Sequence, residues 1–418
     1  MSRLSAAGRL PRTTRTPATG RTPATGRVAS DGGGIVAGVV TFSAAESVVT
    51  TVWQSVTRVF HRPLVVSWDF APSGSTYYVA TTGSDSNNGS SGSPFLTIQH
   101  AYDVASPGDL VNVRAGSYVE ALDFTKTGTV SSPVTVSCAP GDLGEVYISV
   151  PSAYIVANAE HAPLRVRGDG VAVVLNGLCL EGTLGRAEAA GDEDQDNNCI
   201  TFQNGAGPSC VVQNCVCYNA QHCGIKERNH GGTGIIVRGC ISFSNGEDLL
   251  DHGIYCPSNN WVIEGNICFS NTGYGIHAYV FPDGHVINRN VCVRNEYGIV
   301  LAGSAAQCYH NVLAYNTSDG IDWYNTFCVN NLFKNNVVAF NGVAESQAYT
   351  PGTGNVDDYN DYYPGVSDPD LGSQIGIHNL NADPLFVDAT NNDFRLQGGS
   401  PCKNAATNVG LGADMGAY

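Results

Sequence analysis

One short phrase, in which apolar and polar positions alternate, recurs six times between residues 214 and 341. Its copies are NCVCYN, CISFSN, NICFSN, NVCVRN, NVLAYN and NVVAFN, and they begin at residues 214, 240, 266, 290, 311 and 336. The second and fourth positions are mostly Val, Ile, Phe, Ala or Cys, which is the alternation of a β-strand and not a helical stripe. Successive copies begin 26, 26, 24, 21 and 25 residues apart. This period predicts a solenoid, in which each repeat buries its apolar face against its neighbours.

The last position of the phrase is Asn in every copy. A stacked Asn can bond its side-chain amide to the coils on either side, and Asn tolerates the left-handed backbone of a turn. Leucine-rich repeats share the period but need a Leu-rich frame, and propeller blades need about 40 residues or more. We therefore predict an all-β fold, a right-handed single-stranded parallel β-helix of about ten coils, with the six Asn stacked in one turn.

Composition divides the chain into four parts. Residues 1–30 are an arm rich in Arg, Thr, Pro and Gly, in which TPATGR occurs twice, and such a segment cannot bury enough apolar surface to fold alone. Residues 31–71 alternate like strands and predict a small β module. The β-helix is expected over residues 77–341, with a short helix capped by Thr97 covering its open N-terminal end. Residues 342–418 are expected to form a C-terminal loop and cap.

The net charge limits the classes of binding partner, whereas the cysteine content does not decide between an oxidising and a reducing compartment. The net charge of −16 at pH 7 argues against nucleic acid or an anionic membrane as partner. The 14 Cys include several in the repeat phrase, where Val, Phe or Leu substitute for them, so we interpret them as stacked core thiols, with a few ladder disulfides as the alternative. No secretory signal is recognisable, and the apolar run at residues 34–40 is too short to span a bilayer.

Both ends of the predicted β-helix resemble a known group of proteins. The N-terminal end contains YYVATTGSDSNNG, PFLTIQHA and PGDLVNVRAGSYVE, and the C-terminal end contains DPLFVD and NDFRLQGGSPC. These motifs are similar to those of the pectate-lyase-like right-handed β-helix proteins, which include the family 9 polysaccharide lyases. The resemblance covers residues 77–418 and implies the fold. It leaves activity open, because this fold hosts lyases, hydrolases, epimerases and inert adhesins.

A stripe of outward-facing residues is the predicted binding surface. Five copies of the phrase are followed by a Gly-Ile pair, and if each Ile points inward, the first and third residues after it point outward. Coils stack about 4.8 Å apart, so these residues form one continuous stripe of rings and charged groups, which suits a sugar chain. The predicted substrate-binding residues are Tyr255, His277, Tyr279, Asp322 and Tyr324.

Candidate catalytic residues lie at the basic end of this stripe, in the motif GIKERNHG. A lyase needs a base for the proton beside a uronate carboxylate, and cations or a metal to hold the enolate-like charge. Lys226 fits the base and Arg228 the cation. Glu227 either pairs with one of these cations or serves a hydrolase, which would combine it with Asp248 or Asp251 as acid and base.

Two acidic loops make calcium the one candidate cofactor. Asp248 and Asp251 lie in NGEDLLDHGIY, and family 9 lyases hold calcium with an Asp cluster on such a turn, although Glu247 stands where a second adjacent Asp is expected. The other loop contains DEDQDNN, whose aspartates have calcium-loop spacing but lack the Gly and Glu of an EF-hand, so a solvated loop is the alternative there. The candidate ligands in this second loop are Asp192, Asp194 and Asp196.

Three classes of function fit these features. The order of arm, β module and β-helix is similar to the layout of phage tailspikes and favours a virion receptor-binding protein that grips a surface glycan. The second class is a secreted calcium-dependent lyase of an acidic polysaccharide, and the third is a non-catalytic structural surface protein. The spike hypothesis predicts a homotrimer, or docking on a larger assembly through residues 1–70. It shares with the lyase hypothesis a glycan partner and an extracellular or virion location.

Overall fold

The computed structural model describes residues 25–26, 39–40, 72–151, 162–184, 197–228, 232–279, 283–365 and 368–418. The chain divides into two compact units, Met1–Glu46 and Ser47–Tyr418. In the first unit, β1 (Thr25–Gly26) and β2 (Val39–Val40) pair in parallel. The rest of the predicted arm and of the small β module lies outside the described residues.

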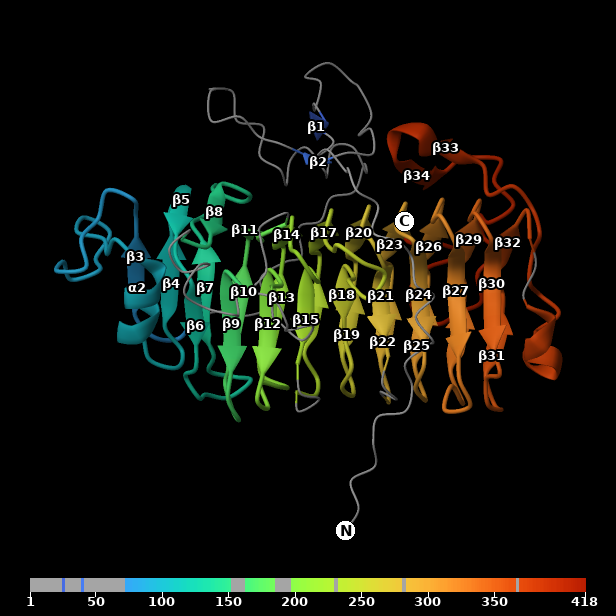
Figure 1. Cartoon of the computed structure of the whole chain (residues 1–418), viewed down its shortest axis with the longest axis horizontal. Coiled ribbons are helices and arrows are strands. Elements are labelled where there is room, and N and C mark those ends of the chain that lie inside the picture. The colour runs from blue at the N-terminus through green and yellow to red at the C-terminus, as the bar shows by residue number, and fades with distance from the viewer. Residues whose placement is uncertain are drawn as a thin grey trace, which may run out of the picture. The chain divides into compact units, whose positions relative to one another are not determined.

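Three parallel sheets build the second unit, and each turn of the chain adds one strand to each of them (Figure 1). Sheet 1 consists of β3 (Thr76–Val79), β4 (Leu110–Val113), β7 (Val134–Cys138), β10 (Val173–Asn176), β13 (Cys210–Gln213), β16 (Ile236–Arg238), β19 (Val262–Glu264), β22 (Val286–Asn288), β25 (Gln307–Tyr309), β28 (Leu332–Lys334) and β31 (Val356–Asp358). Sheet 2 consists of β5 (Gly116–Val119), β8 (Val146–Ser149), β11 (Leu178–Glu181), β14 (Val216–Tyr218), β17 (Ile241–Phe243), β20 (Ile267–Phe269), β23 (Val291–Val293), β26 (Val312–Ala314), β29 (Val337–Ala339) and β32 (Asp361–Tyr363). Sheet 3 consists of β6 (Leu122–Phe124), β9 (Leu164–Arg167), β12 (Ile200–Gln203), β15 (Ile225–Glu227), β18 (Ile254–Tyr255), β21 (Tyr274–Ala278), β24 (Tyr297–Leu301), β27 (Asp319–Tyr324) and β30 (Ala344–Tyr349).

This arrangement is the predicted right-handed parallel β-helix. The described strands fill nine three-strand coils, from β4–β6 to β28–β30, and a tenth that holds β31 and β32. In Figure 1 the stack runs from β3, drawn in blue, to β32, drawn in orange. Inward-facing Val, Ile, Leu, Phe and Cys form one continuous core through the coils, because each coil buries its apolar side chains against the next. None of the described helices is long and apolar enough to cross a membrane.

The first end of the stack is closed by α2 (Ile98–Val104), as the sequence predicts. The Thr97 hydroxyl accepts a hydrogen bond from the His100 N–H at 3.3 Å, which satisfies one of the free donors in the first helical turn. Ile98, Ala101 and Tyr102 face the core and are buried, and the Tyr102 ring stacks on Phe124 at 4.0 Å. The helix therefore removes the first coil's apolar face from water.

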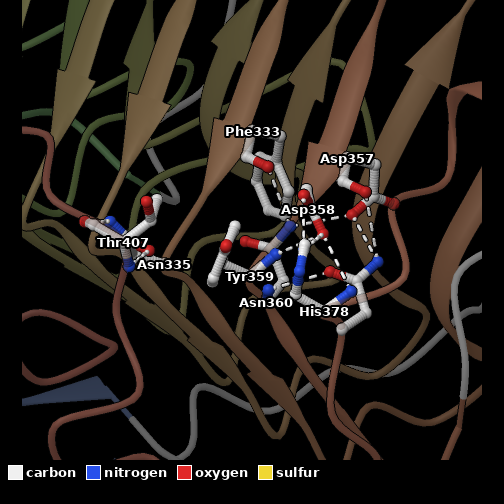
Figure 2. A network of polar contacts seen from close by, with 9 residues as sticks. Phe333, Asn335, Asp357, Asp358, Tyr359, Asn360, His378 and Thr407 are labelled. Carbon is white, nitrogen blue, oxygen red and sulfur yellow. Dashed lines mark hydrogen bonds and ion pairs between the residues drawn. The ribbon is translucent and has the colours of Figure 1, made fainter.

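The chain that follows the last coil first contacts it through the segment that holds η1 (Pro369–Gln374). It then runs back along the stack, where η2 (Ala389–Asn391) and the antiparallel pair β33 (Phe386–Asp388) and β34 (Asp393–Leu396) contact earlier coils (Figure 1). Figure 2 shows part of the contact with the last coil, where the Asp358 carboxylate accepts from His378 N–H and lies 3.0 Å from its Nδ1. The His378 ring also stacks on Tyr359 at 4.3 Å. Asn360 bonds Phe333 O and Asp357 Oδ1 at 2.8 Å each. This network supplies partners for groups that would otherwise lie unpaired at the end of the stack.

The closing Asn residues form a hydrogen-bonded ladder, but with five members instead of the predicted six. Each Nδ2 donates to the Oδ1 of the next residue at 2.9 to 3.3 Å, in the order Asn245, Asn271, Asn295, Asn316 and Asn341. Asn219 is one residue out of register, because Tyr218 pairs with Phe243 and Asn219 is therefore opposite Ser244. The N–H of Ala220 bonds Asn245 Oδ1 in its place at 3.0 Å. The prediction for Asn219 was wrong, since the repeats are aligned by their strands and not by their last Asn.

The Asn residues at the first position of the phrase form a second ladder. The sequence predicted a ladder only for the Asn at the last position. Its amide-to-amide bonds are 2.9 to 3.0 Å long and connect Asn266, Asn290, Asn311, Asn336 and Asn360. The Oδ1 of Asn379 then accepts from the Asn360 N–H at 2.9 Å and ends this ladder. All 14 cysteines are free and buried, so the interpretation as core thiols is confirmed.

Candidate functional site

The outer face of sheet 3 carries the predicted stripe. The five Ile of the Gly-Ile pairs are in register and fully buried. The residues that follow them therefore form one outward column, which reads Lys226, Tyr255, His277, Val300 and Asp322. The same column continues towards the N-terminus through Thr201, Arg165 and Asp123. Strand register thus brings the predicted binding residues onto one face.

Aromatic rings cover the middle of this face. The His277 ring lies parallel to Tyr274 at 4.8 Å and 4°, and to Tyr279 at 4.9 Å and 17°. The rings of Tyr279 and Tyr324 are 5.3 Å apart, although they belong to coils that are two apart in the stack. The residue between them is Ala302, directly after β24, and its small side chain lets the two rings meet. Tyr324 in turn contacts Tyr349 at 5.8 Å. Rings in this arrangement offer flat apolar surfaces against which a sugar can stack.

Asp322 lies among these rings and is the most perturbed acid of the face. Its exposed fraction is 1%, and its Oδ2 accepts a hydrogen bond from the Tyr274 hydroxyl, which reaches it from two coils away. Burial, helped by the nearby Asp319 carboxyl and opposed by the Tyr274 hydrogen bond, raises the pKa of Asp322 to about 7. Asp322 therefore holds its proton over much of the pH range in which an ordinary aspartate is charged.

Three buried polar atoms of this face stand out because, within the described part of the chain, they have no hydrogen-bond partner. They are Oδ1 of Asp322, Oδ1 of Asp319 and Nδ1 of His277. The exposed fractions of these residues are 1%, 3% and 9%. A buried polar group without a partner costs about 1 to 3 kcal/mol. Such groups therefore need an explanation, and a bound ligand is one that the surrounding rings favour.

The two histidines of the face are neutral. Burial lowers the pKa of His277 to about 3, and burial together with the neighbouring His277 and Lys226 lowers the pKa of His252 well below its usual value. Their rings are 3.9 Å apart, and Nδ1 of His252 accepts a hydrogen bond from the Tyr274 N–H at 3.0 Å. His252 therefore supports the backbone beside Tyr274, whereas His277 is the imidazole with a ring nitrogen left for a ligand.

The predicted catalytic residues do not all lie on this face. The Lys226 ammonium lies 5.9 Å from the Tyr255 ring centroid, so Lys226 joins the outward column. Glu227 pairs in register with Phe202 and is 1% exposed, which places its side chain in the interior, where Oε1 accepts from the Gly232 N–H at 3.3 Å. Arg228 follows β15 and is half-buried. The structure therefore places Glu227 on the opposite face of β15 from Lys226.

The loop before β18 does not gather its carboxylates around one point. Asp251 Oδ2 accepts from the N–H groups of Glu247 and Asp248 at 2.9 Å each, and its Oδ1 lies 3.5 Å from His222 Nδ1. Asp248 accepts from the Leu250 N–H at 2.7 Å. Across the described ranges, no three His, Cys, Asp or Glu side chains are grouped as metal ligands. Asp251 therefore accepts hydrogen bonds within its own loop, and calcium binding by Asp248 and Asp251 stays a prediction.

The second predicted calcium loop cannot be compared with the structure. Asp192, Asp194 and Asp196 lie outside the described residues. By contrast, the structure adds residues that the stripe pattern missed, namely Tyr274, Tyr297, Asp319 and Tyr349. A signal for two of them is present in the sequence, because the tripeptide Tyr-Gly-Ile occurs at residues 274–276 and again at 297–299.

The amino-acid sequence of this chain is similar to those of several known proteins. The family model described as "Periplasmic copper-binding protein (NosD)" matches residues 165–358. Pectate lyase L of Dickeya chrysanthemi is 25% identical over 293 residues, which cover 62% of this chain and 65% of the lyase. The uncharacterized protein YwoF of Bacillus subtilis (strain 168) is 37% identical over 110 residues, or 26% of this chain and 22% of YwoF. The chain thus spans less than two thirds of the length of these curated relatives.

Solved structures give the same picture of the fold. Pectate lyase Pel9A superposes with a TM-score of 0.59 at 17% identity, covering 84% of this chain and 97% of the lyase chain. A GH136 lacto-N-biosidase from Eubacterium ramulus superposes with a TM-score of 0.50 at 14% identity, covering 74% of this chain and 67% of the other. The chain is a right-handed parallel β-helix protein similar to the pectate lyases in sequence and in fold.

Proposed function

We propose that this protein binds a polysaccharide or surface glycan along the outer face of sheet 3. The observation that carries the proposal is the set of three buried, unpaired polar atoms of Asp319, Asp322 and His277 on a face lined by tyrosine rings. A sugar provides both complements, since its hydroxyls can pair with such atoms and its ring faces can stack on tyrosines. The similarity to pectate lyases supports a polysaccharide as the ligand class.

The biological setting follows from this binding role. We propose an extracellular or virion-borne protein, because a polysaccharide ligand is met outside the cell. The arm and β module at residues 1–70 favour a spike-type receptor-binding protein that forms trimers or docks on a larger assembly. The similarity to pectate lyase L instead favours a secreted lyase, with Lys226 as base and Arg228 as the cation beside it. Measuring the molar mass of the intact protein separates these classes, because a stable trimer supports the spike and a monomer supports the secreted enzyme.

Retention on an array of acidic and neutral polysaccharides tests the binding proposal. We expect Tyr279→Ala and Tyr324→Ala each to weaken binding roughly fivefold, since an aromatic stack contributes on the order of 1 kcal/mol. Phe327→Ala is the matched control, because Phe327 is an exposed ring, at 57%, in the turn that follows β27 and not on a strand of sheet 3. Wild-type protein that is retained by no polysaccharide, or tyrosine variants that bind as well as Phe327→Ala, would remove this face from the function.

Substitutions of Lys226 and Arg228, at the basic end of the stripe, test whether the ligand is acidic. For an acidic polysaccharide, Lys226→Ala and Arg228→Ala should each weaken affinity by about 1 to 3 kcal/mol, as expected for charged hydrogen bonds. In a lyase, Lys226→Ala should also abolish the ultraviolet-absorbing unsaturated product while binding persists. The assay is run with and without chelator, so that a calcium requirement appears as a loss of retention or of product. Affinity for neutral glycans alone, indifferent to both substitutions, would exclude the basic end from the site.

A further inference from the structure

We propose that the same face hydrolyses its bound glycan, with Asp322 as the general acid and Asp319 as the general base. This inference rests on the proposed glycan binding and adds a reaction to it. It differs from the lyase hypothesis in its residues, because Lys226 lies four strands, or about 19 Å, from Asp322 along the column. The acid and base are therefore sought at the C-terminal end of the face.

The environment of Asp322 suits a proton donor. The Tyr274 hydroxyl donates to Oδ2, which leaves the proton of the neutral acid on Oδ1. That oxygen has no partner among the described residues. Burial and the neighbouring carboxyl raise the pKa of Tyr274 well above its ordinary value, so this phenol stays protonated and keeps donating. The pKa of Asp322, about 7, holds a proton available at neutral pH.

Asp319 lies where a second carboxyl is needed. It begins β27, three residues before Asp322, and its carboxyl is near enough to add to the burial that raises the pKa of Asp322. Burial raises the pKa of Tyr297 and of Tyr349, and both carboxyls are close enough to raise it as well. The Ser318 hydroxyl donates to Oδ2 of Asp319 at 3.2 Å, while its Oδ1 has no partner among the described residues. Two carboxyls beside the same two rings are the kind of pair that serves as acid and base in glycoside hydrolysis.

The reaction balances with water as the one co-reactant. Asp322 Oδ1 gives its proton to the glycosidic oxygen as the bond between that oxygen and the anomeric carbon breaks. The oxygen of a water bonds to the anomeric carbon, and the water's proton passes to the Asp319 carboxylate. The products are an alcohol and a new reducing end, and proton exchange with solvent restores both carboxyls. Burial, with a smaller contribution from the Asp319 carboxylate, keeps the proton on Asp322 up to about neutral pH, which is the starting state this step needs.

Access to the acid requires a local adjustment. Asp322 is 1% exposed, whereas the neighbouring Tyr349 is 43% exposed. The ring of Tyr349 is therefore the one that a sugar can displace at the least loss of packing. Contacts between a catalytic acid and its substrate commonly tighten only in the complex.

The test uses the intact protein and any polysaccharide that the array retains. New reducing ends and ultraviolet-absorbing unsaturated ends are measured together, because hydrolysis produces the first without the second. We expect new reducing ends from wild type, with a rate that Asp322→Asn and Asp319→Asn each lower by about 100-fold or more, while retention persists. Asp283→Asn is the matched control, since Asp283 is an exposed aspartate at the sheet 1 side and should leave the rate unchanged.

A pH profile separates the acid from a merely structural residue. The groups that face Asp322 are Tyr274, Tyr297, Asp319 and Tyr349. Tyr274→Phe removes the donor to Oδ2, so we expect the descending limb of the rate–pH profile to move to higher pH while the reaction persists. Retention without any new reducing ends would overturn the hydrolysis and leave the binding proposal intact. Unsaturated ends that both Asp variants still produce would show a lyase and refute the inference. A wild-type protein that no polysaccharide of the array retains would refute the binding proposal itself.

Discussion

The Asn ladder provides the sharpest test of what holds the coils together, and Asn295→Ala is the perturbation. Asn295 is 1% exposed and sits in the middle of the ladder. Its Oδ1 accepts from the N–H and from the Nδ2 of Asn271, both at 3.0 Å, and its Nδ2 donates to Cys268 O at 3.0 Å and to Asn316 Oδ1 at 3.3 Å. One side chain thus connects three successive coils.

The expected cost follows from the groups that lose their partner. In the alanine variant the Asn271 N–H loses its acceptor and Cys268 O loses a donor, and both are buried. Asn271 Nδ2 keeps its bond to Ser242 O at 3.1 Å, so it is not counted. At about 1 to 3 kcal/mol for each buried group left unpaired, and with some relaxation, we expect a loss of about 2 to 4 kcal/mol. Asn271→Ala should cost a similar amount.

The assay is urea unfolding followed by tryptophan fluorescence, for which the buried Trp261 and Trp323 are suitable probes. Asn219→Gly is the matched control, because this Asn is outside the ladder and has a left-handed backbone, with a φ of 55°, that Gly adopts without strain. We expect it to change stability by less than about 1 kcal/mol. Equal losses in Asn295→Ala and Asn219→Gly would show that the ladder bonds contribute nothing of their own.

Two further predictions concern charge and assembly. The folded-state pKa of Asp322, about 7, lies above its ordinary value of 3.8, so the native protein binds a proton that the unfolded chain lacks between about pH 4 and 7. The free energy of unfolding should therefore fall as pH rises through that window. Asp322→Asn should stabilise the protein at pH 8 by up to about 4 kcal/mol, from 3.2 pH units at about 1.36 kcal/mol each. At pH 4 the same substitution should hardly change the stability. Equal melting-temperature shifts at both pH values would contradict this. Deleting residues 1–70 should abolish assembly while leaving a folded β-helix with unchanged glycan affinity, and a truncated protein that is folded but no longer binds sugar would disprove it.

The fold was predictable from the sequence because a solenoid is governed by local periodicity. Alternation sets which side chains enter the core, and stacking of similar coils then places equivalent residues in one column. For that reason the phrase alone predicted the β-helix, and the Gly-Ile pairs alone predicted that Tyr255, His277 and Asp322 share a face. The sequence also indicated the capping helix after Thr97, because its N-cap and apolar spacing are local signals.

Only the tertiary structure decided the details that depend on reach and on exact register. Asn219 left the ladder because its strand pairs one residue earlier than the motif suggests. Asp251 turned back onto its own loop, whereas the inward position of Glu227 already follows from the alternation after Ile225. The bond from Tyr274 to Asp322 spans two coils, and no spacing along one strand encodes it. A repeat pattern sets the position of each Cα atom, whereas side-chain length, turn geometry and burial determine which polar groups meet and which titrate near neutral pH.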